Sequence, residues 1–283
     1  MLNWIKDRFR RGPVVPVVAL SGVIAPESRF GARGVSMEST AAVLRRAFDT
    51  KGAKAVALSI NSPGGSPVQS ALIAARIRLL AAEKDLPVLA FVEDVAASGG
   101  YWLACAADEI VADPSSIVGS IGVISAGFGF QDLIQRIGVE RRVHTSGERK
   151  AMLDPFRPEN EEDVARLKRL QAEIHEDFKK WVRQRRGARL RGDDALLFSG
   201  EFWTGRRGFE LGLVDSLGDL RSTLQARYGA NVRLPLISAR RRLLARVGIG
   251  SGIRSRIGSG MESIGPATIA AIEERLHWQR FGL

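Results

Sequence analysis

The 283-residue chain alternates between short, wholly apolar runs and longer segments in which apolar residues recur every three or four positions. The apolar runs are rich in β-branched residues and bounded by turn residues, a pattern that predicts buried strands. The intervening segments predict amphipathic helices. Strands are expected at residues 14–24, 53–60, 86–92 and 109–111, and helices at residues 36–48, 68–80 and 101–107.

This order of strand, turn and helix predicts an α/β fold with a largely parallel sheet. A longer helix is expected over residues 159–186, where acidic residues come first and basic residues follow, as the helix dipole favours. Near residue 234 the amino-acid composition changes, and residues 240–256 contain six arginines and no acid. We therefore expect three parts, namely a basic N-terminal segment (1–12), a main domain (13–233) and a basic C-terminal extension with an amphipathic helix (234–283).

The composition is that of a globular protein, with 45% hydrophobic residues and a formal net charge of +11. Such a charge suits an acidic partner, either an anionic membrane surface or nucleic acid. No apolar run reaches the roughly 18 residues needed to span a bilayer, and the basic start lacks the apolar core of a signal peptide. A cytoplasmic location, with peripheral membrane association, is the expectation. The single cysteine, Cys105, lies in an apolar run and is expected to be a buried structural thiol.

Candidate chemistry begins at Asp94-Val-Ala-Ala-Ser98-Gly-Gly-Tyr-Trp102, which places one serine between strand-like and helix-like sequence. A serine at such a turn, beside two glycines, can present its hydroxyl next to free backbone N–H groups. That arrangement is typical of an acyl-transfer nucleophile. The competing interpretation is that Ser98 caps a helix and that the glycines permit close packing.

A serine nucleophile needs a neighbouring base. The chain contains three histidines, of which His175 and His277 lie in charged helical sequence and are interpreted as surface residues. His144 is an alternative base. Lys150 lies in the same segment, and a lysine becomes a base where burial and nearby positive charge disfavour its ammonium form.

The turn Asn61-Ser-Pro-Gly-Gly65 could direct backbone N–H groups at a substrate carbonyl, or simply precede a helix. It lacks the lysine of a phosphate-binding loop. No cluster of cysteine and histidine has zinc-site spacing. We therefore expect neither a metal nor a cofactor.

Together these segments resemble the serine peptidases of the signal peptide peptidase A, or protease IV, family, which includes SohB-like enzymes. The resemblance covers residues 14–228. It implies the Clp protease/crotonase-like α/β fold and a Ser-Lys dyad. It rests on residues 204–215 and on the motifs Ile60-Asn-Ser-Pro-Gly-Gly65, Ala97-Ser-Gly-Gly-Tyr101, Gly119-Ser-Ile-Gly-Val123 and Ser146-Gly-Glu-Arg-Lys150.

By this resemblance Ser98 is the nucleophile, Lys150 the general base and Ser120 the hydroxyl that orients the lysine amine. The backbone N–H groups of Gly65 and Gly99 are expected to form the oxyanion hole.

For the first oxyanion donor the sequence leaves Gly64 as an alternative to Gly65. In short members of the family the serine and lysine of one active site come from adjacent subunits of a ring. This chain has one copy of the domain, so the resemblance implies a homo-oligomer.

The implied function is that of a serine endopeptidase acting on unfolded or membrane-derived peptides. An acyl-CoA-processing enzyme on the same fold and a non-catalytic scaffold are the alternatives. Nucleic-acid binding would rest on charge alone and is not expected. Where members of the family typically carry a membrane anchor, we expect only the basic stretch that ends at Arg11, and we hypothesise that the two basic ends bind an anionic membrane surface. The alternative is that the tail packs on a neighbouring subunit.

Overall fold

The computed structural model describes residues 12–26, 34–147, 149–238, 275, 278, 279 and 281. Its centre is a seven-stranded sheet. The strands are β1 (Val17–Ser21), β2 (Val56–Ser62), β3 (Val88–Ala97), β4 (Glu109–Ala112), β5 (Ile117–Gly119), β6 (Phe202–Thr204) and β7 (Ser216–Leu217).

The main path of the sheet runs β1-β2-β3-β4-β7, and every pair along it is parallel. The long strand β3 pairs with β4 through its first half and with β5 through its second half. Strand β6 adds an antiparallel edge to β5. This arrangement confirms the predicted α/β fold with a largely parallel sheet.

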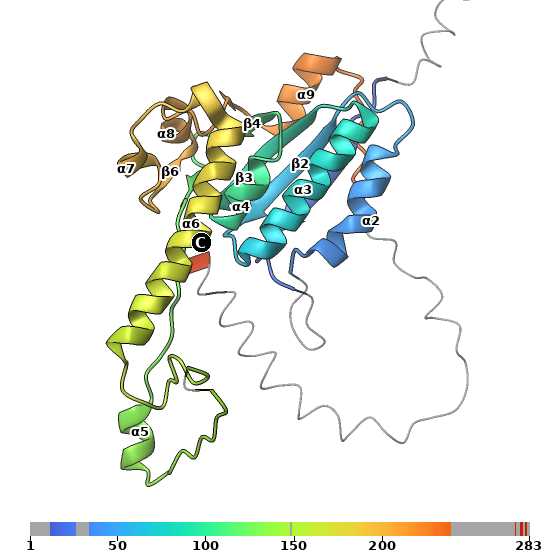
Figure 1. The fold of residues 1–283 in the computed structure, drawn as a ribbon. Helices are drawn as coiled ribbons and strands as arrows, with labels where there is room; N and C mark the ends of the chain where they lie inside the picture. The colour runs from blue at the N-terminus through green and yellow to red at the C-terminus, as the bar shows by residue number, and fades with distance from the viewer. Residues whose placement is uncertain are drawn as a thin grey trace, which may run out of the picture.

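Helices cover the two faces of the sheet unequally (Figure 1). The larger apolar core lies under α2, α3, α4 and α6, and the smaller core lies under α9 on the opposite face. The helices are α2 (Met37–Phe48), α3 (Pro67–Lys84), α4 (Gly99–Ala104), α5 (Gln131–Arg136), α6 (Glu161–Arg186), α7 (Asp194–Leu197), α8 (Gly205–Glu210) and α9 (Leu220–Tyr228), with a 3-10 turn η1 at Gly187–Arg189.

Helix α6 spans about 39 Å at 1.5 Å per residue. The Asn160 side chain accepts a hydrogen bond from the Glu162 N–H at its start, and three acids occupy the first turn. Three arginines occupy the last turn, so the helix dipole is compensated at both ends. The predicted helix at 159–186 is confirmed to within two residues.

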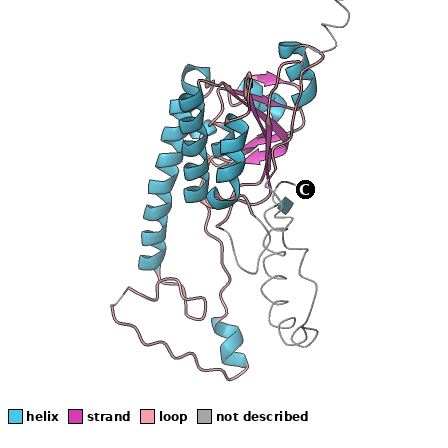
Figure 2. Ribbon diagram, turned by 90° about the vertical axis from the view of Figure 1, so that its right-hand side faces the viewer, coloured by secondary structure: helices cyan, strands magenta, loops and turns pink. Residues whose placement is uncertain are grey.

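Residues 122–160, here called the arm, connect β5 to α6 and extend away from the sheet together with α5 (Figures 1 and 2). None of the arm residues that the structure describes is buried. The arm therefore contributes nothing to the core of its own chain.

The chain beyond Leu234 continues along the sheet. Residues 233–237 run parallel to β1, with Val17 N–H donating to the Pro235 carbonyl at 2.9 Å and Ile237 N–H to the Val17 carbonyl at 2.8 Å. Residues 1–11 and 239–274, which hold most of the two expected basic segments, lie outside the described residues. No helix in the described ranges is long and apolar enough to cross a membrane.

A buried ion pair connects the last residue of α6 to Asp215, the residue before β7. Arg186, whose side chain is 1% exposed, donates to the Asp215 carboxylate at 2.6 and 2.9 Å and to the Gly212 carbonyl. Replacing Arg186 with methionine is expected to lower the free energy of unfolding by about 3–5 kcal/mol, because the Asp215 carboxylate loses both hydrogen bonds from Arg186 and keeps only the more exposed Arg189, at 3.3 Å, as an ionic partner among the described residues. Equilibrium urea unfolding measures the change.

The matched control is Arg207, which pairs with Glu210 at 2.7 Å on the surface. Arg207→Met is expected to cost less than about 1 kcal/mol. Burial raises the pKa of Asp215, but the hydrogen bonds from Arg186 outweigh burial and hold this pKa below its usual value. The stability contributed by the pair is therefore present at neutral pH and is lost as the pH falls below about 4. Equal losses in the two variants would contradict the prediction.

Candidate active site

Ser98 occupies the turn between β3 and α4 in a conformation that L-residues rarely adopt. Its φ of 52° and ψ of −120° are the values of the first central position of a type II′ turn, where glycine is the usual residue. The side chain makes no capping hydrogen bond to α4 and is partly exposed. The helix-cap interpretation of Ser98 is therefore wrong. A serine held on a strained strand-to-helix turn is the arrangement of a nucleophile elbow.

The two glycine pairs singled out in the sequence pack directly against each other. A Cβ on Gly64 would lie 2.8 Å from both the Gly99 nitrogen and the Ser98 Cβ, and one on Gly100 would lie 2.4 Å from the Ser62 carbonyl oxygen. Only residues without a Cβ permit this approach. The turn after β2 thus forms one wall beside Ser98.

Two backbone N–H groups near Ser98 have no acceptor among the described residues. Gly99 is the first residue of α4, where an N–H has no intrahelical partner. The Gly65 N–H has no acceptor either. The two hydrogen bonds between this turn and Ile24 are made by the residues on either side, the Gly64 carbonyl accepting from the Ile24 N–H and the Ser66 N–H donating to the Ile24 carbonyl. Gly64 N–H, in contrast, donates to Ser62 Oγ at 3.2 Å. Among the described residues, the Gly65 N–H is therefore available as a donor and the Gly64 N–H is not.

Ser120 lies beside Ser98 at the carboxyl end of the neighbouring strand. Ala97 of β3 pairs with Gly119 of β5, so the two serines follow paired residues. Ser98 N–H donates to the Gly119 carbonyl at 2.8 Å, which fixes the two strand ends together. Ser120 is buried and also has a positive φ, of 51°.

Lys150 belongs to the arm, which extends away from the sheet whose strands β3 and β5 end beside the two serines (Figure 1). It is exposed, and its amine forms no hydrogen bond or ion pair with another described residue. His144, the alternative base, is also exposed in the arm. Within one chain, neither candidate base contacts Ser98.

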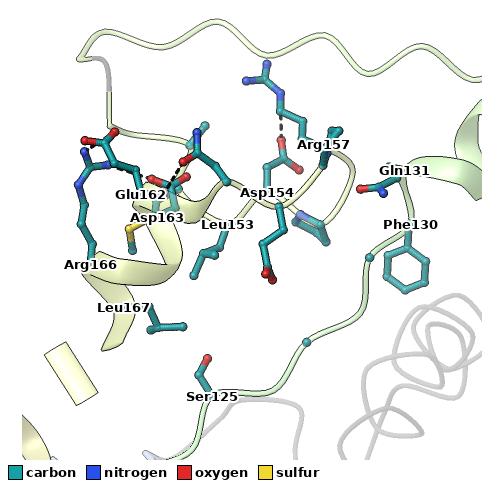
Figure 3. Close-up of a pocket in the computed structure, with 18 of the residues that line it drawn as sticks. Ser125, Phe130, Gln131, Leu153, Asp154, Arg157, Glu162, Asp163, Arg166 and Leu167 are labelled. Atoms are coloured by element: carbon teal, nitrogen blue, oxygen red, sulfur yellow. Dashed lines mark hydrogen bonds and ion pairs between the residues drawn. The ribbon is translucent and has the colours of Figure 1, made fainter. Parts of the chain in front are cut away.

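A cavity of about 1110 Å³ lies within the arm and against the start of α6 (Figure 3). Ser125, Phe130 and Gln131 line one side, and Asp163 and Leu167 of α6 line the other. The cavity lining includes the two neighbours of Lys150 in the sequence but none of the residues around Ser98.

The remaining residues considered in the sequence are two histidines and the single cysteine. His175 is half-buried, and its Nε2 lies 2.9 Å from the Ile121 carbonyl oxygen, so its assignment as a surface residue is wrong. Its position three residues before the buried Phe178 on α6 is the sequence signal that could have found it. Cys105 is confirmed as a buried thiol, and burial raises its pKa to about 12. His277 is outside the described residues.

The described residues contain no group of three or more His, Cys, Asp or Glu side chains placed to hold a metal ion. The candidate residues supply hydroxyl groups, backbone N–H groups and an amine.

The mostly parallel sheet with helices on both faces has the Clp protease/crotonase-like fold. The model of "Peptidase family S49" matches residues 81–232, a segment that contains Ser98, Ser120 and Lys150. The chain belongs to peptidase family S49.

Similar proteins carry names from this family and one name from outside it. The chain is 53% identical over 289 residues to the "Na(+)/H(+) antiporter NhaA" of Brucella abortus, across 99% of this chain and 38% of that protein. It is 30% identical to the "Putative signal peptide peptidase SppA" of Enterococcus faecium, across 71% of this chain and 59% of that protein. It is 31% identical to "Protease 4" of Haemophilus influenzae, across 79% and 36%. The chain thus spans less than two thirds of the length of each of these relatives.

Proposed function

We propose that this chain is a serine endopeptidase that cleaves unfolded or membrane-derived peptides through a Ser98-Lys150 dyad. The observation that carries the proposal is the strained, uncapped conformation of Ser98 in a chain of peptidase family S49. Backbone conformations of this kind cost about 1–3 kcal/mol and cluster at functional sites.

In the proposed mechanism the Ser98 hydroxyl attacks the peptide carbonyl carbon while its proton passes to the neutral Lys150 amine. The tetrahedral intermediate collapses when the C–N bond breaks and the leaving amine takes that proton. Water then attacks the acyl-enzyme ester and gives a proton to Lys150. Lys150 passes that proton to the Ser98 oxygen as the ester C–O bond breaks and the acid product leaves. Ser120 orients the lysine amine throughout.

Gly65 and Gly99 supply the N–H groups that bind the oxyanion in this mechanism. Both N–H groups lack an acceptor among the described residues, whereas the Gly64 N–H is already used. Gly99 follows Ser98 in the chain, and Gly65 follows Gly64, which packs against Ser98. We therefore assign the first donor to Gly65. Removing one such donor typically costs about 3 kcal/mol of transition-state stabilisation.

The Ser98-Lys150 pair forms between adjacent subunits of a homo-oligomeric ring in this proposal. Its support is the exposed position of Lys150 in an arm whose described residues are all unburied, outside the sheet whose strand ends hold both serines. The arm also exposes large apolar side chains, including Phe128 (75% exposed) and Ile137 (63% exposed). Apolar surface of this kind marks a contact with another protein. A neighbouring subunit would remove both the arm and Lys150 from water.

Labelling with a fluorophosphonate, followed by peptide mapping, tests the proposed nucleophile. The expected adduct is on Ser98, and unlabelled, correctly assembled protein that also fails to cleave an unstructured substrate would contradict the proposal. Crotonase-type acyl-CoA chemistry needs no serine adduct, so the same experiment separates the two activities.

The antiporter name of the Brucella relative does not alter this proposal. Nearly the whole of this chain aligns with that protein, so the alignment includes the residues matched by the peptidase family model. Ion exchange is therefore not part of the function proposed for this chain.

The basic extension is proposed to bind an anionic membrane surface. Replacing the six arginines of residues 240–256 with glutamine is expected to lower binding to vesicles containing 30% phosphatidylserine by at least about tenfold, because each arginine near such a surface contributes about 1 kcal/mol. Vesicle co-sedimentation measures the loss, and this variant keeps Trp278 and Phe281, which pack beside the sheet. Neutral vesicles are the control. Equal binding by both proteins would contradict the membrane role.

A further inference from the structure

His175 donates the one hydrogen bond that the described residues make to the carbonyl of Ile121, the residue after Ser120. The distance from Nε2 to the carbonyl oxygen is 2.9 Å. A carbonyl only accepts, so the imidazole must carry a proton on Nε2. Ile121 is fully buried, so bulk water does not reach its carbonyl while the histidine is in place.

The segment that His175 holds is the one that sets the position of Ser120. Gly122 N–H donates to the Ser120 carbonyl at 2.9 Å, closing a three-residue turn centred on Ile121. Ser120 N–H donates to the Glu201 carbonyl at 2.7 Å on the other side. Ser120, with its positive φ, is therefore anchored by Glu201, the residue before β6, on one side of the turn and by His175 on the other.

Helix α6 contacts the Ser98 side of the site through the same face. Trp181 Nε1 donates to the Trp102 carbonyl of α4 at 3.0 Å, and the Phe178 ring stacks on the Trp102 ring with centroids 4.7 Å apart. Positions 175, 178 and 181 recur every three residues and so share one face of the helix. One helix thus contacts the helix that follows Ser98 and the turn that follows Ser120.

We propose that His175 is a positioning residue, which holds the Ile121 carbonyl so that the Ser120 hydroxyl stays beside Ser98 and can orient the lysine amine. This inference rests on the proposed Ser98-Lys150 mechanism. His175 touches neither substrate nor a reacting atom, and it acts through Ser120.

The test compares His175→Leu, which removes the donor, with His175→Gln, whose side-chain amide can place an N–H near the position of Nε2. We expect His175→Leu to lower kcat about tenfold, with KM within about twofold of wild type, and His175→Gln to recover most of the loss. Thermal melting and oligomeric mass are measured for each variant. If the leucine variant does not assemble, His175→Asn replaces it, because its shorter amide does not reach Ile121.

A merely structural role is separated by repeating the substitution in a Ser120→Ala background. If His175 acts through Ser120, the double variant is no slower than Ser120→Ala alone, whereas independent effects multiply. Wild-type turnover by His175→Leu, or a multiplied loss in the double variant, would overturn the inference. Ser98→Ala is assayed beside these variants. If it is inactive while His175→Leu is fully active, only the role of His175 fails, and if Ser98→Ala is active, the proposed function fails with it.

Discussion

Replacing Ser98 with alanine is expected to lower the turnover of an unstructured protein substrate by at least about 10⁴-fold, because the acyl-enzyme cannot form. Lys150→Ala should fall by a similar factor, since a dyad acts as a unit and loses its function with either member. Turnover is measured at matched oligomeric mass. His144→Ala is the matched control from the same arm, and it should remain active.

The backbone of Ser98 supplies a second readout for the same site. Ser98→Gly is expected to be as inactive as Ser98→Ala but about 1 kcal/mol more stable, because glycine adopts a φ of 52° and ψ of −120° without strain. Wild-type activity in a pure Ser98→Ala sample would rule out the mechanism. A Ser98→Gly protein less stable than Ser98→Ala would instead rule out the strained turn as described.

The arrangement around Ser98 was predictable because it depends on local sequence. Strands β1 to β4 each contain a short apolar run, and glycine pairs mark both turns that meet beside Ser98. The carboxyl ends of neighbouring parallel strands lie at one edge of the sheet, so Ser98 and Ser120 follow paired residues. Family resemblance was needed to choose Ser120 from among the other serines, because a single hydroxyl residue has no distinctive pattern.

Long-range contacts were less accessible to prediction. Helix α6 was expected from its length and charge order, but its charged composition hid the face through which His175 and Trp181 reach the site. Strand β3 was expected to end at Val92, yet it continues to Ala97. Its partner changes there from β4 to β5, and the Asn61 side chain accepts a hydrogen bond from the Val95 N–H at the change. The exposed acids at that point resemble the end of a strand in sequence.

Mixing the two inactive variants is expected to restore activity. In a ring, each active site would take Ser98 from one subunit and Lys150 from the next, so Lys150→Ala subunits still carry the serine and Ser98→Ala subunits still carry the lysine. At random one-to-one assembly, half of the subunits carry the serine and half of their neighbours carry the lysine. The recovered activity is then about a quarter of the wild-type value per subunit, whatever the ring size.

Dilution of wild type with the double variant Ser98→Ala/Lys150→Ala distinguishes a shared site from one that only needs assembly. A site formed across an interface leaves about a quarter of the activity per subunit in a one-to-one mixture, whereas a site within one chain leaves about half. Subunit exchange is verified by native mass spectrometry. No recovery from the single variants, together with half activity on dilution, would show that serine and lysine of one site belong to the same chain. The arm would then have to fold back onto the sheet and leave the exposed position that it has in the isolated chain.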